Sequence, residues 1–530
     1  MRPSGNSRTI VALGSLAVLV CSACASQSSS TNNGNRTLIV EQSFNSGPLA
    51  SLDPAHGILP TPIMIDKSVY DTLLTLNPSD LTKPYPALAT SFTVSPDAKT
   101  FTFQLRPGVK FANGDPLTSA DVVWSLTRLR AFQDAGLTSA VEMTGLTATA
   151  PDPSTVVLKS DSPNPAVPIV MTQSNTGILD SKLVQQNGGT SDAKDQADAY
   201  LNGPNQAGSG PYMITAFDRT NEADLQANPN YWGPKPTYNK VIVRNVPSAT
   251  QQLDIQDGQA QMALNITLQE AQSLGSSVRV IAGTSLDQEI LEMNADPNVS
   301  PLTANQHFRD AVRYGLDYQG ILVLAGKGAA SPTGGLIPVG ILGALPASDA
   351  PQRDVALAKA ALAQVGVSNP TVELDYSTDG SVDGLSPALL AAKIQSDLKQ
   401  IGITVNLVAN TVAVTFQTKI ATGKAQIWFT SNQADYPDPS DFLIWAPGGF
   451  LGSILHWKTG FDPSLDTLVT SASSAVAIAD RNSAYQALGK AMNVTAYLID
   501  IVQPGKGMVV AKSVNAIVNP FNSVDLGSVS

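Results

Sequence analysis

The sequence predicts a mixed α/β protein with more than one domain. Its 530 residues correspond to roughly two to four domains at about 100–200 residues each. Strand and helix patterns alternate in the second half of the chain, as they do where sheets contain parallel strands. Hydrophobic residues make up 43% and charged residues 14% of the chain, with a mean hydropathy near zero. This composition is typical of soluble globular proteins and excludes disordered and multi-span membrane chains.

In the first half, a strand pair and a helix are the clearest elements. The alternating pattern over 100–106 predicts a strand, which a Pro-Gly turn joins to a second strand over 109–111. A helix follows with Thr118 as its N-cap. Earlier in the chain, an apolar run at 37–40 predicts a strand, and a second apolar run follows at 69–76. The apolar face of the helix carries Val122, Leu126 and Leu129.

In the second half, a β-α-β unit is predicted. The segments 371–376 and 403–408 have strand patterns, and between them a helix begins at Ser386-Pro387 and ends at Gly402. A further helix is predicted over 354–365, directly before this unit. The order of elements favours a sheet that is at least partly parallel. One face of the helix between the strands carries Leu390, Ile394, Leu398 and Ile401.

Charge and rare residues exclude several kinds of chemistry. The chain has 32 Lys and Arg against 43 Asp and Glu, a net charge of −11, and no long basic run, so nucleic acid is not an expected partner. Its few histidines and cysteines are too scattered for a metal cluster or a disulfide framework. We therefore expect no cofactor and no metal. These residues are His56, His307, His456, Cys21 and Cys24.

The N-terminus predicts export. Residues 1–9 carry two arginines and no acidic residue, and an apolar run over 10–20 follows. This pattern indicates a secretory signal peptide over 1–23, because the run is too short for a permanent membrane span.

The signal peptide ends in a pattern similar to the lipobox of bacterial lipoproteins. Ala23 directly precedes Cys24, which implies lipid attachment at Cys24. The alternative is a plain signal peptide cut nearby, because Cys21 stands where a lipobox usually has leucine. The polar segment 24–36 is predicted to be a flexible tether.

Four groups of segments carry a family resemblance. They are 86–89 with 95–111 and 113–124, then 210–212 with 228–233, then Asn294 with 308–317, and finally 434–442. On these motifs the chain resembles family 5 of the extracytoplasmic solute-binding proteins of ABC importers, which includes oligopeptide-, dipeptide- and nickel-binding members. The resemblance spans the chain from about residue 37 to the C-terminus.

The resemblance implies a two-lobed periplasmic-binding-protein fold with a hinge and an extra N-terminal subdomain. We expect lobe I at 37–285, with the subdomain inserted at about 75–200. Lobe II is expected at 286–489, and 490–530 is expected to return to lobe I.

The resemblance also implies a function and partners. A peptide is captured between the lobes, and a membrane permease reads the closed state while a separate ATPase hydrolyses ATP. We expect a monomer, held by its lipid anchor at the outer face of the cytoplasmic membrane. Alternative ligands are a nickel or metal chelate and a small oligosaccharide, because the family includes such members.

Asp435 is the ligand contact that the resemblance singles out. In peptide-binding members, an acidic residue in the corresponding Ala-Asp-Tyr motif accepts the N-terminal ammonium of the ligand. Pro437 and Pro439 provide a stiff frame for such a carboxylate. The alternative is that Asp435 caps a turn, although Asp438 and Asp441 are better candidates for capping.

Other candidates have structural alternatives. The aromatic residues near Asp435 are candidates for lining the cleft, but each is as well suited to a core. The pair Tyr231-Trp232 is more typical of a loop anchor, and the spacing of Arg309, Arg313 and Asp317 favours ordinary ion pairing on a helix. The cleft candidates are Trp428, Tyr436, Trp445 and Trp457.

An enzyme is not predicted. The chain contains no Gly-x-Ser-x-Gly nucleophile elbow and no Gly-x-x-x-x-Gly-Lys phosphate loop. A secreted hydrolase is kept only as a remote alternative to a binding protein.

Overall fold

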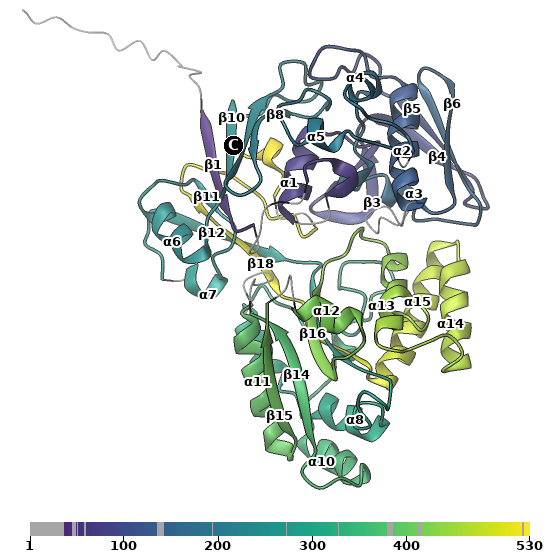
Figure 1. The fold of residues 1–530 in the computed structure, drawn as a ribbon, viewed down its shortest axis with the longest axis vertical. Helices are drawn as coiled ribbons and strands as arrows, with labels where there is room; N and C mark the ends of the chain where they lie inside the picture. Colours follow the sequence, from purple (N-terminus) through teal and green to yellow (C-terminus); the bar gives the residue numbers. More distant parts are fainter. Residues whose placement is uncertain are drawn as a thin grey trace, which may run out of the picture. The chain divides into compact units, whose positions relative to one another are not determined.

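Two large β-sheets organise the computed structural model (Figure 1). The first has seven strands in the order β12-β18-β11-β1-β10-β9-β8, and the second has five in the order β15-β14-β16-β13-β17. The strands of the first are β1 Thr37–Gln42, β8 Tyr212–Asp218, β9 Glu222–Ala227, β10 Lys240–Asn245, β11 Met262–Ala263, β12 Val278–Thr284 and β18 Gly505–Ala511. Those of the second are β13 Gln288–Met293, β14 Thr371–Ser377, β15 Thr404–Asn410, β16 Ile427–Asn432 and β17 Leu498–Val502.

The structure describes residues 36–44, 49, 51–57, 60–134, 143–192, 194–271, 273–326, 328–378, 385–411, 415–521 and 524–530. All of them belong to one unit, Arg36–Ser530. The predicted signal peptide, Cys24 and the predicted tether up to Asn35 lie outside the described residues. None of the described helices has the length and apolar character needed to cross a membrane.

Two smaller sheets and the helices complete the fold. A hairpin is formed by β2 Leu74–Asn77 and β3 Asp80–Pro86, and a four-stranded sheet has the order β4-β5-β7-β6. Its strands are β4 Ala89–Val94, β5 Thr100–Leu105, β6 Leu146–Asp152 and β7 Thr155–Ser160. The α-helices are α1 Pro60–Val69, α2 Ser119–Asp134, α3 Val167–Val170, α4 Ser181–Gln186, α5 Asp198–Leu201, α6 Ser248–Gln256, α7 Leu268–Ala271, α8 Gln306–Gly315, α9 Tyr318–Leu324, α10 Val355–Gln364, α11 Pro387–Ile401, α12 Gln417–Ala421, α13 Phe450–Ile454, α14 Pro463–Ser474 and α15 Ile478–Thr495. The 3-10 helices are η1 Pro54–His56, η3 Ser174–Thr176, η4 Ala347–Asp349, η6 Pro439–Trp445 and η7 Leu526–Ser528.

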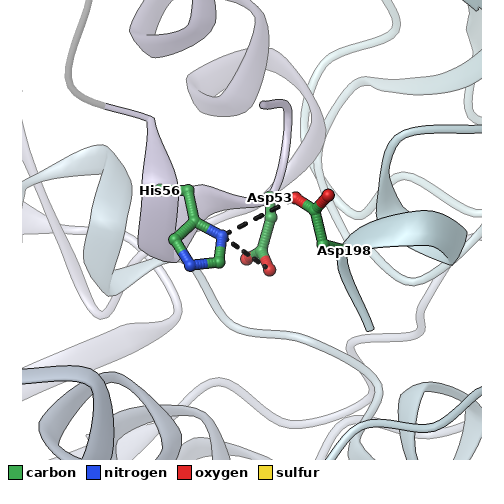
Figure 2. A group of neighbouring side chains, drawn as sticks. All are labelled: Asp53, His56 and Asp198. Atoms are coloured by element: carbon green, nitrogen blue, oxygen red, sulfur yellow. Dashed lines mark ion pairs between the residues drawn. The ribbon is translucent and has the colours of Figure 1, made fainter. Parts of the chain in front are cut away.

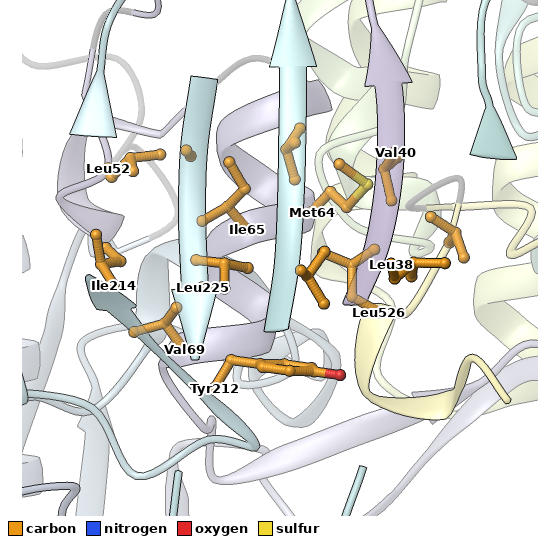
Figure 3. Packing of buried hydrophobic residues seen from close by; sticks show 14 of the residues in the cluster. Leu38, Val40, Leu52, Met64, Ile65, Val69, Tyr212, Ile214, Leu225 and Leu526 are labelled. Atoms are coloured by element: carbon orange, nitrogen blue, oxygen red, sulfur yellow. The ribbon is translucent and has the colours of Figure 1, made fainter. Parts of the chain in front are cut away.

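The core of the seven-stranded sheet forms where α1 packs on it (Figure 3). Leu38 of β1 and Leu225 of β9 are fully buried there, together with Ile65 of α1. Burying a side chain of this size is worth about 1.5–3 kcal/mol, so this layer contributes much of the stability of that half of the chain.

The five-stranded sheet buries both of its faces. Along β13, Ile290 and Leu291 belong to different hydrophobic clusters because successive side chains point to opposite faces of a strand. The cluster with Leu291 contains α8 and α11, and the cluster with Ile290 contains η6 and α15. This second cluster also takes in Leu76, Leu81 and Ile169 from the first third of the chain.

The chain passes between the two large sheets at two places. Residues 285–287 join β12 to β13, and residues 503–504 join β17 to β18. The Gln503 side-chain amide donates to the carbonyl of Ser285, and Lys506 Nζ lies 3.4 Å from Asp287 Oδ2, so the two passages are tied to each other. After the second passage, β18 inserts between β12 and β11. The lobe boundaries given above stay a prediction.

Most of the predicted elements are present. In the second half, β14 and β15 pair in parallel and α11 joins them, ending at Gly402, whose φ of 100° is left-handed. Asp354 caps α10 by accepting from the backbone of Ala356. In the first half, Thr118 precedes α2, and its backbone and hydroxyl both donate to Asp121.

The predicted hairpin over 100–111 is wrong. The partners of β5 are β4 on one side and β7 on the other, so neither edge is open to residues 109–111. Those residues instead close a tight loop, in which Leu117 donates to the carbonyl of Val109. The apolar run 69–76 is also divided, between the end of α1 and the start of β2.

Candidate functional site

The segment that follows β16 is held in place by aspartates. Asp441 Oδ2 accepts from the backbone N–H of Asp435, at 3.0 Å. Asp438 caps η6 by accepting from the backbone of Ser440 and forms an ion pair with Arg481 in which both side chains are 6% exposed. The capping role predicted for Asp438 is confirmed. The backbone at Asp435 is fixed by its hydrogen bond to Asp441.

The carboxylate of Asp435 has no partner of its own among the described residues. No hydrogen bond or ion pair reaches it from that part of the chain, although the side chain is exposed. The surrounding protein still desolvates it, which raises the pKa of Asp435 above its ordinary value. Asp435 therefore offers an accessible carboxylate that protein cations leave unneutralised.

A residue from the first half of the chain contacts this segment. Gln173 follows α3, and its side-chain amide donates to the carbonyl of Asp435 at 2.9 Å across 262 residues of sequence. Gln173 is 5% exposed, and its Oε1 is buried with no hydrogen-bond partner among the residues that the structure describes. Tyr436, which directly follows Asp435, packs against two hydrophobic clusters. One is the cluster of the four-stranded sheet, and the other is the cluster of η6 and α15.

The three candidate tryptophans lie in the core. Trp428 of β16, Trp445 of η6 and Trp457 are 0%, 3% and 1% exposed. In this conformation they present almost no surface to a ligand. The ligand-binding roles proposed for Asp435, Tyr436, Trp428 and Trp445 stay predictions.

A buried carboxyl group that the sequence analysis did not single out lies beside Trp428. Glu292 of β13 is paired with Trp428 across the sheet, is 3% exposed and accepts a hydrogen bond from Thr430 Oγ1. Burial raises the pKa of Glu292 to about 8. Its sequence signal is a charge between the apolar residues Leu291 and Met293 of β13.

The raised pKa of Glu292 predicts a pH-dependent stability. Because the folded state keeps the proton and the unfolded state loses it above pH 4.5, stability falls as pH rises from 4.5 toward 8. Glu292→Gln cannot ionise, so its stability relative to the unmodified protein should improve by up to about 1.4 kcal/mol per pH unit in that window. Urea unfolding at pH 5, 6.5 and 8 measures this slope, and a constant difference between the two proteins would contradict it.

The loop-anchor interpretation of Tyr231-Trp232 is confirmed, whereas Arg309, Arg313 and Asp317 do not form the ion pairs with one another that their spacing favoured. Arg309 is 4% exposed and donates to two backbone oxygens. Asp317 caps α9 and pairs with Lys393 at 2.8 Å. Trp232 Nε1 donates to Asp71 Oδ2 at 2.7 Å, which anchors its loop. These contacts are structural.

One histidine lies beside two carboxylates (Figure 2). His56 Nδ1 is 3.5 Å from Asp53 Oδ2 and 3.7 Å from Asp198 Oδ1. The hydrogen bond to Asp53 raises the pKa of His56. These three residues could offer ligand atoms to a metal ion. The other histidines lie elsewhere, with His456 Nδ1 3.0 Å from Asn294 Oδ1.

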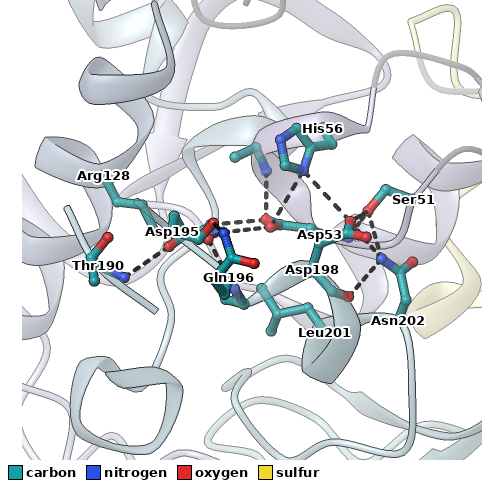
Figure 4. Close-up of polar contacts among 12 residues, drawn as sticks. Ser51, Asp53, His56, Arg128, Thr190, Asp195, Gln196, Asp198, Leu201 and Asn202 are labelled. Atoms are coloured by element: carbon teal, nitrogen blue, oxygen red, sulfur yellow. Dashed lines mark hydrogen bonds and ion pairs between the residues drawn. The ribbon is translucent and has the colours of Figure 1, made fainter. Parts of the chain in front are cut away.

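The carboxylates around His56 are already engaged (Figure 4). Arg128 forms ion pairs with both Asp53 and Asp195. Burial alone would raise the pKa of Asp53, but the Arg128 guanidinium holds it well below its usual range. Ser51 and Asn202 donate to Asp198, each at 2.7 Å. A cation at His56 would have to displace these partners, so the cluster is a structural network.

Comparison with known proteins decides the family. Residues 83–450 match the sequence pattern of the bacterial extracellular solute-binding proteins, family 5, middle region. The chain belongs to this family. The resemblance carried by the sequence motifs is confirmed.

Two curated relatives of this family 5 protein are named for peptides. The probable D,D-dipeptide-binding periplasmic protein DdpA of Escherichia coli K12 is 26% identical over 420 residues, which cover 73% of this chain and 78% of the relative. The probable di/tripeptide-binding protein 5 of Pseudomonas aeruginosa is 24% identical over 330 residues, 61% of each chain.

Solved structures share the fold. CtaP, an ABC transporter substrate-binding protein of Listeria monocytogenes, has a TM-score of 0.80 at 18% identity, over 93% of this chain and 99% of its own. A dipeptide-binding protein of Pseudoalteromonas in complex with Met-Leu has a TM-score of 0.78 at 20% identity, with the same coverage. The predicted α/β, two-lobed periplasmic-binding-protein fold is confirmed.

Proposed function

We propose that this family 5 protein is the peptide-binding component of an ABC import system. It holds a peptide between its two lobes and presents it to a membrane permease. The observation that carries the peptide assignment is the carboxylate of Asp435, which is accessible and has no partner in the described part of the chain. It stands in the Ala-Asp-Tyr motif with which similar peptide-binding proteins hold the ligand's ammonium.

The surroundings of Asp435 support this role. A ligand ammonium would neutralise a carboxylate that desolvation disfavours in its charged form, so binding would relieve a cost already present in the free protein. The backbone at Asp435 is held by Asp441 on its own segment and by Gln173 from the first half of the chain. With the backbone fixed from both sides, only the side-chain torsions of Asp435 have to be ordered when a ligand binds.

The proposed mechanism is closure of lobe II (286–489) on lobe I (37–285 with the C-terminal return). The passages at 285–287 and 503–504 are the hinge of this proposal, since only they join the two large sheets along the chain. Converting a population from 1:99 to 99:1 closed requires about 5.5 kcal/mol of differential affinity. A single ion pair is too weak for this, so backbone hydrogen bonds to an extended peptide supply the remainder.

The proposal also places the protein in the cell. After removal of residues 1–23, Cys24 carries the lipid anchor, and the segment 24–36 tethers a monomeric binding domain to the outer face of the cytoplasmic membrane. The permease and a separate ATPase are its partners. The protein binds its ligand without converting it.

Mass spectrometry of protein extracted from membranes with a mild detergent tests both parts of the proposal. Under denaturing conditions, we expect the mass of a polypeptide that begins at Cys24 plus that of its acyl groups. More than one acyl group is expected, because a single acyl chain binds membranes only weakly. Under native conditions, a further mass equal to a short peptide should be retained. Cys24→Ser should move the protein to the soluble fraction.

Two outcomes would contradict the proposal separately. A retained metal chelate or oligosaccharide would exclude the peptide assignment but leave the anchor intact. Membrane attachment of the Cys24→Ser variant would exclude the anchor but leave the ligand assignment intact.

A further inference from the structure

A cavity of about 210 Å³ lies beside β17, within the second half of the chain. Its lining includes Arg313 and Tyr314 of α8, Asn493 near the end of α15, and Asp500 of β17. None of the residues that contact Asp435 lines it. The cavity is thus separate from the site proposed above and is argued independently of it.

Asp500 places a carboxylate in the lining that nothing else in the described chain satisfies. The residue is 4% exposed, and within the described residues its Oδ1 is buried without a hydrogen-bond partner. Burial raises the pKa of Asp500 to about 7. A buried polar group without a hydrogen-bond partner destabilises the fold, and more so when it is charged. Such a group needs an explanation in a native fold.

Arg313 lines the same cavity with the opposite charge. Its guanidinium donates to the carbonyl of Asn493 and to the hydroxyl of Tyr314, each at 2.8 Å. Its Nε is buried with no hydrogen-bond partner in the described part of the chain. The nearest carboxylate recorded for it is that of Asp310, at 3.9 Å. Within the described residues, Arg313 forms no ion pair with Asp500. A second carboxylate in the lining, that of Asp349, pairs with Lys490 at 3.8 Å. Asp500 and Arg313 therefore border one cavity with opposite charges and do not pair with each other.

We propose that this cavity binds a small zwitterion of the size of a free α-amino acid, with its ammonium at Asp500 and its carboxylate at Arg313. Such a ligand supplies the donor that Asp500 lacks and a planar acceptor for the guanidinium, which binds carboxylates well. The volume of 210 Å³ corresponds to about seven water molecules at roughly 30 Å³ each. A small amino acid fits this space.

The site adjoins the passage between the sheets. Asp500 lies on β17, which ends at Val502, directly before the passage at 503–504.

Calorimetric titration of L-alanine into the purified full-length protein tests the proposal. We expect saturable binding, reduced at least about tenfold in Asp500→Asn, because a hydrogen bond to a charged group is worth about 1.5–3 kcal/mol. Alaninamide lacks the carboxylate and N-acetylalanine lacks the ammonium, so each should also bind at least about tenfold more weakly. Circular dichroism confirms that the variant is folded.

Two further variants show whether the effect belongs to this cavity. Glu292→Gln changes a buried carboxyl group on the neighbouring strand β13 that is not itself part of the lining, and Asp435→Ala removes the proposed peptide contact; both should bind alanine like the unmodified protein. The proposal is overturned if alanine does not bind, if Asp500→Asn binds it equally well, or if Asp435→Ala abolishes binding. Equal binding of alaninamide would overturn the assignment of the carboxylate to Arg313.

Discussion

Replacing Arg128 with methionine is expected to lower the free energy of unfolding by about 3–5 kcal/mol, the usual cost of breaking a buried ion pair by removing one partner. The Arg128 side chain is 2% exposed, and the side chains of its partners Asp53 and Asp195 are 0% and 3% exposed. Without the guanidinium, both carboxylates stay buried and lose their main counter-charge. Urea unfolding followed by circular dichroism measures the change.

An exposed ion pair in the same network provides the control. Arg219 pairs with Asp198 at 3.1 Å, and their side chains are 43% and 46% exposed. Arg219→Met should cost less than about 1 kcal/mol, because solvent screens such a pair. If both variants lose the same stability, burial of the Arg128 pair is not the cause.

The second large effect is expected on ligand binding. Asp435→Ala should weaken a peptide with a free amino terminus roughly 30-fold or more, since truncating one partner of a buried charge pair costs about 2–5 kcal/mol and 1.4 kcal/mol is a factor of ten. Asp435→Asn keeps the shape of the side chain and its backbone contact to Asp441, so a similar loss in this variant assigns the effect to charge.

Acetylation of the peptide separates recognition of the amine from support of the loop. N-acetylated peptide should bind weakly to the unmodified protein, and Asp435→Ala should then add little further loss. Calorimetry on the four combinations forms a double-mutant cycle that isolates the coupling. Equal losses for free and acetylated peptide would show that Asp435 only shapes its segment.

The sequence predicted best where a structure depends on neighbouring residues. The apolar face of α11, the proline at its start and the glycine at its end all act within the helix itself, so α11 could be located closely. Asp438 was predicted as a cap for the same reason, because its acceptor role involves Ser440, two residues away.

The sequence analysis did not find the buried ion pairs of Arg128, because the polar residues of α2 have the spacing of a solvent-facing helix surface. Asp121, Ser125 and Arg128 form a polar stripe along α2, yet they are 8%, 6% and 1% exposed. They are covered by a distant segment, in which Ser181 donates to Asp121 and Asp195 pairs with Arg128. The contact of Gln173 with Asp435 was equally hidden, since 262 residues separate the two. A pattern of neighbouring residues cannot predict contacts between segments that lie so far apart in the sequence.

The position of β18 determines when the seven-stranded sheet can finish folding. β18 is the last strand of the chain, yet it separates β12 from β11 inside the seven-stranded sheet. During synthesis from the N-terminus, that sheet has an unfilled slot until residues 505–511 emerge, after the whole five-stranded sheet has been made. Such distant pairing raises the contact order, and chains of high contact order fold slowly. A truncation before Gly505 would therefore remove an interior strand of the first sheet and separate the edge strand β12 from β11.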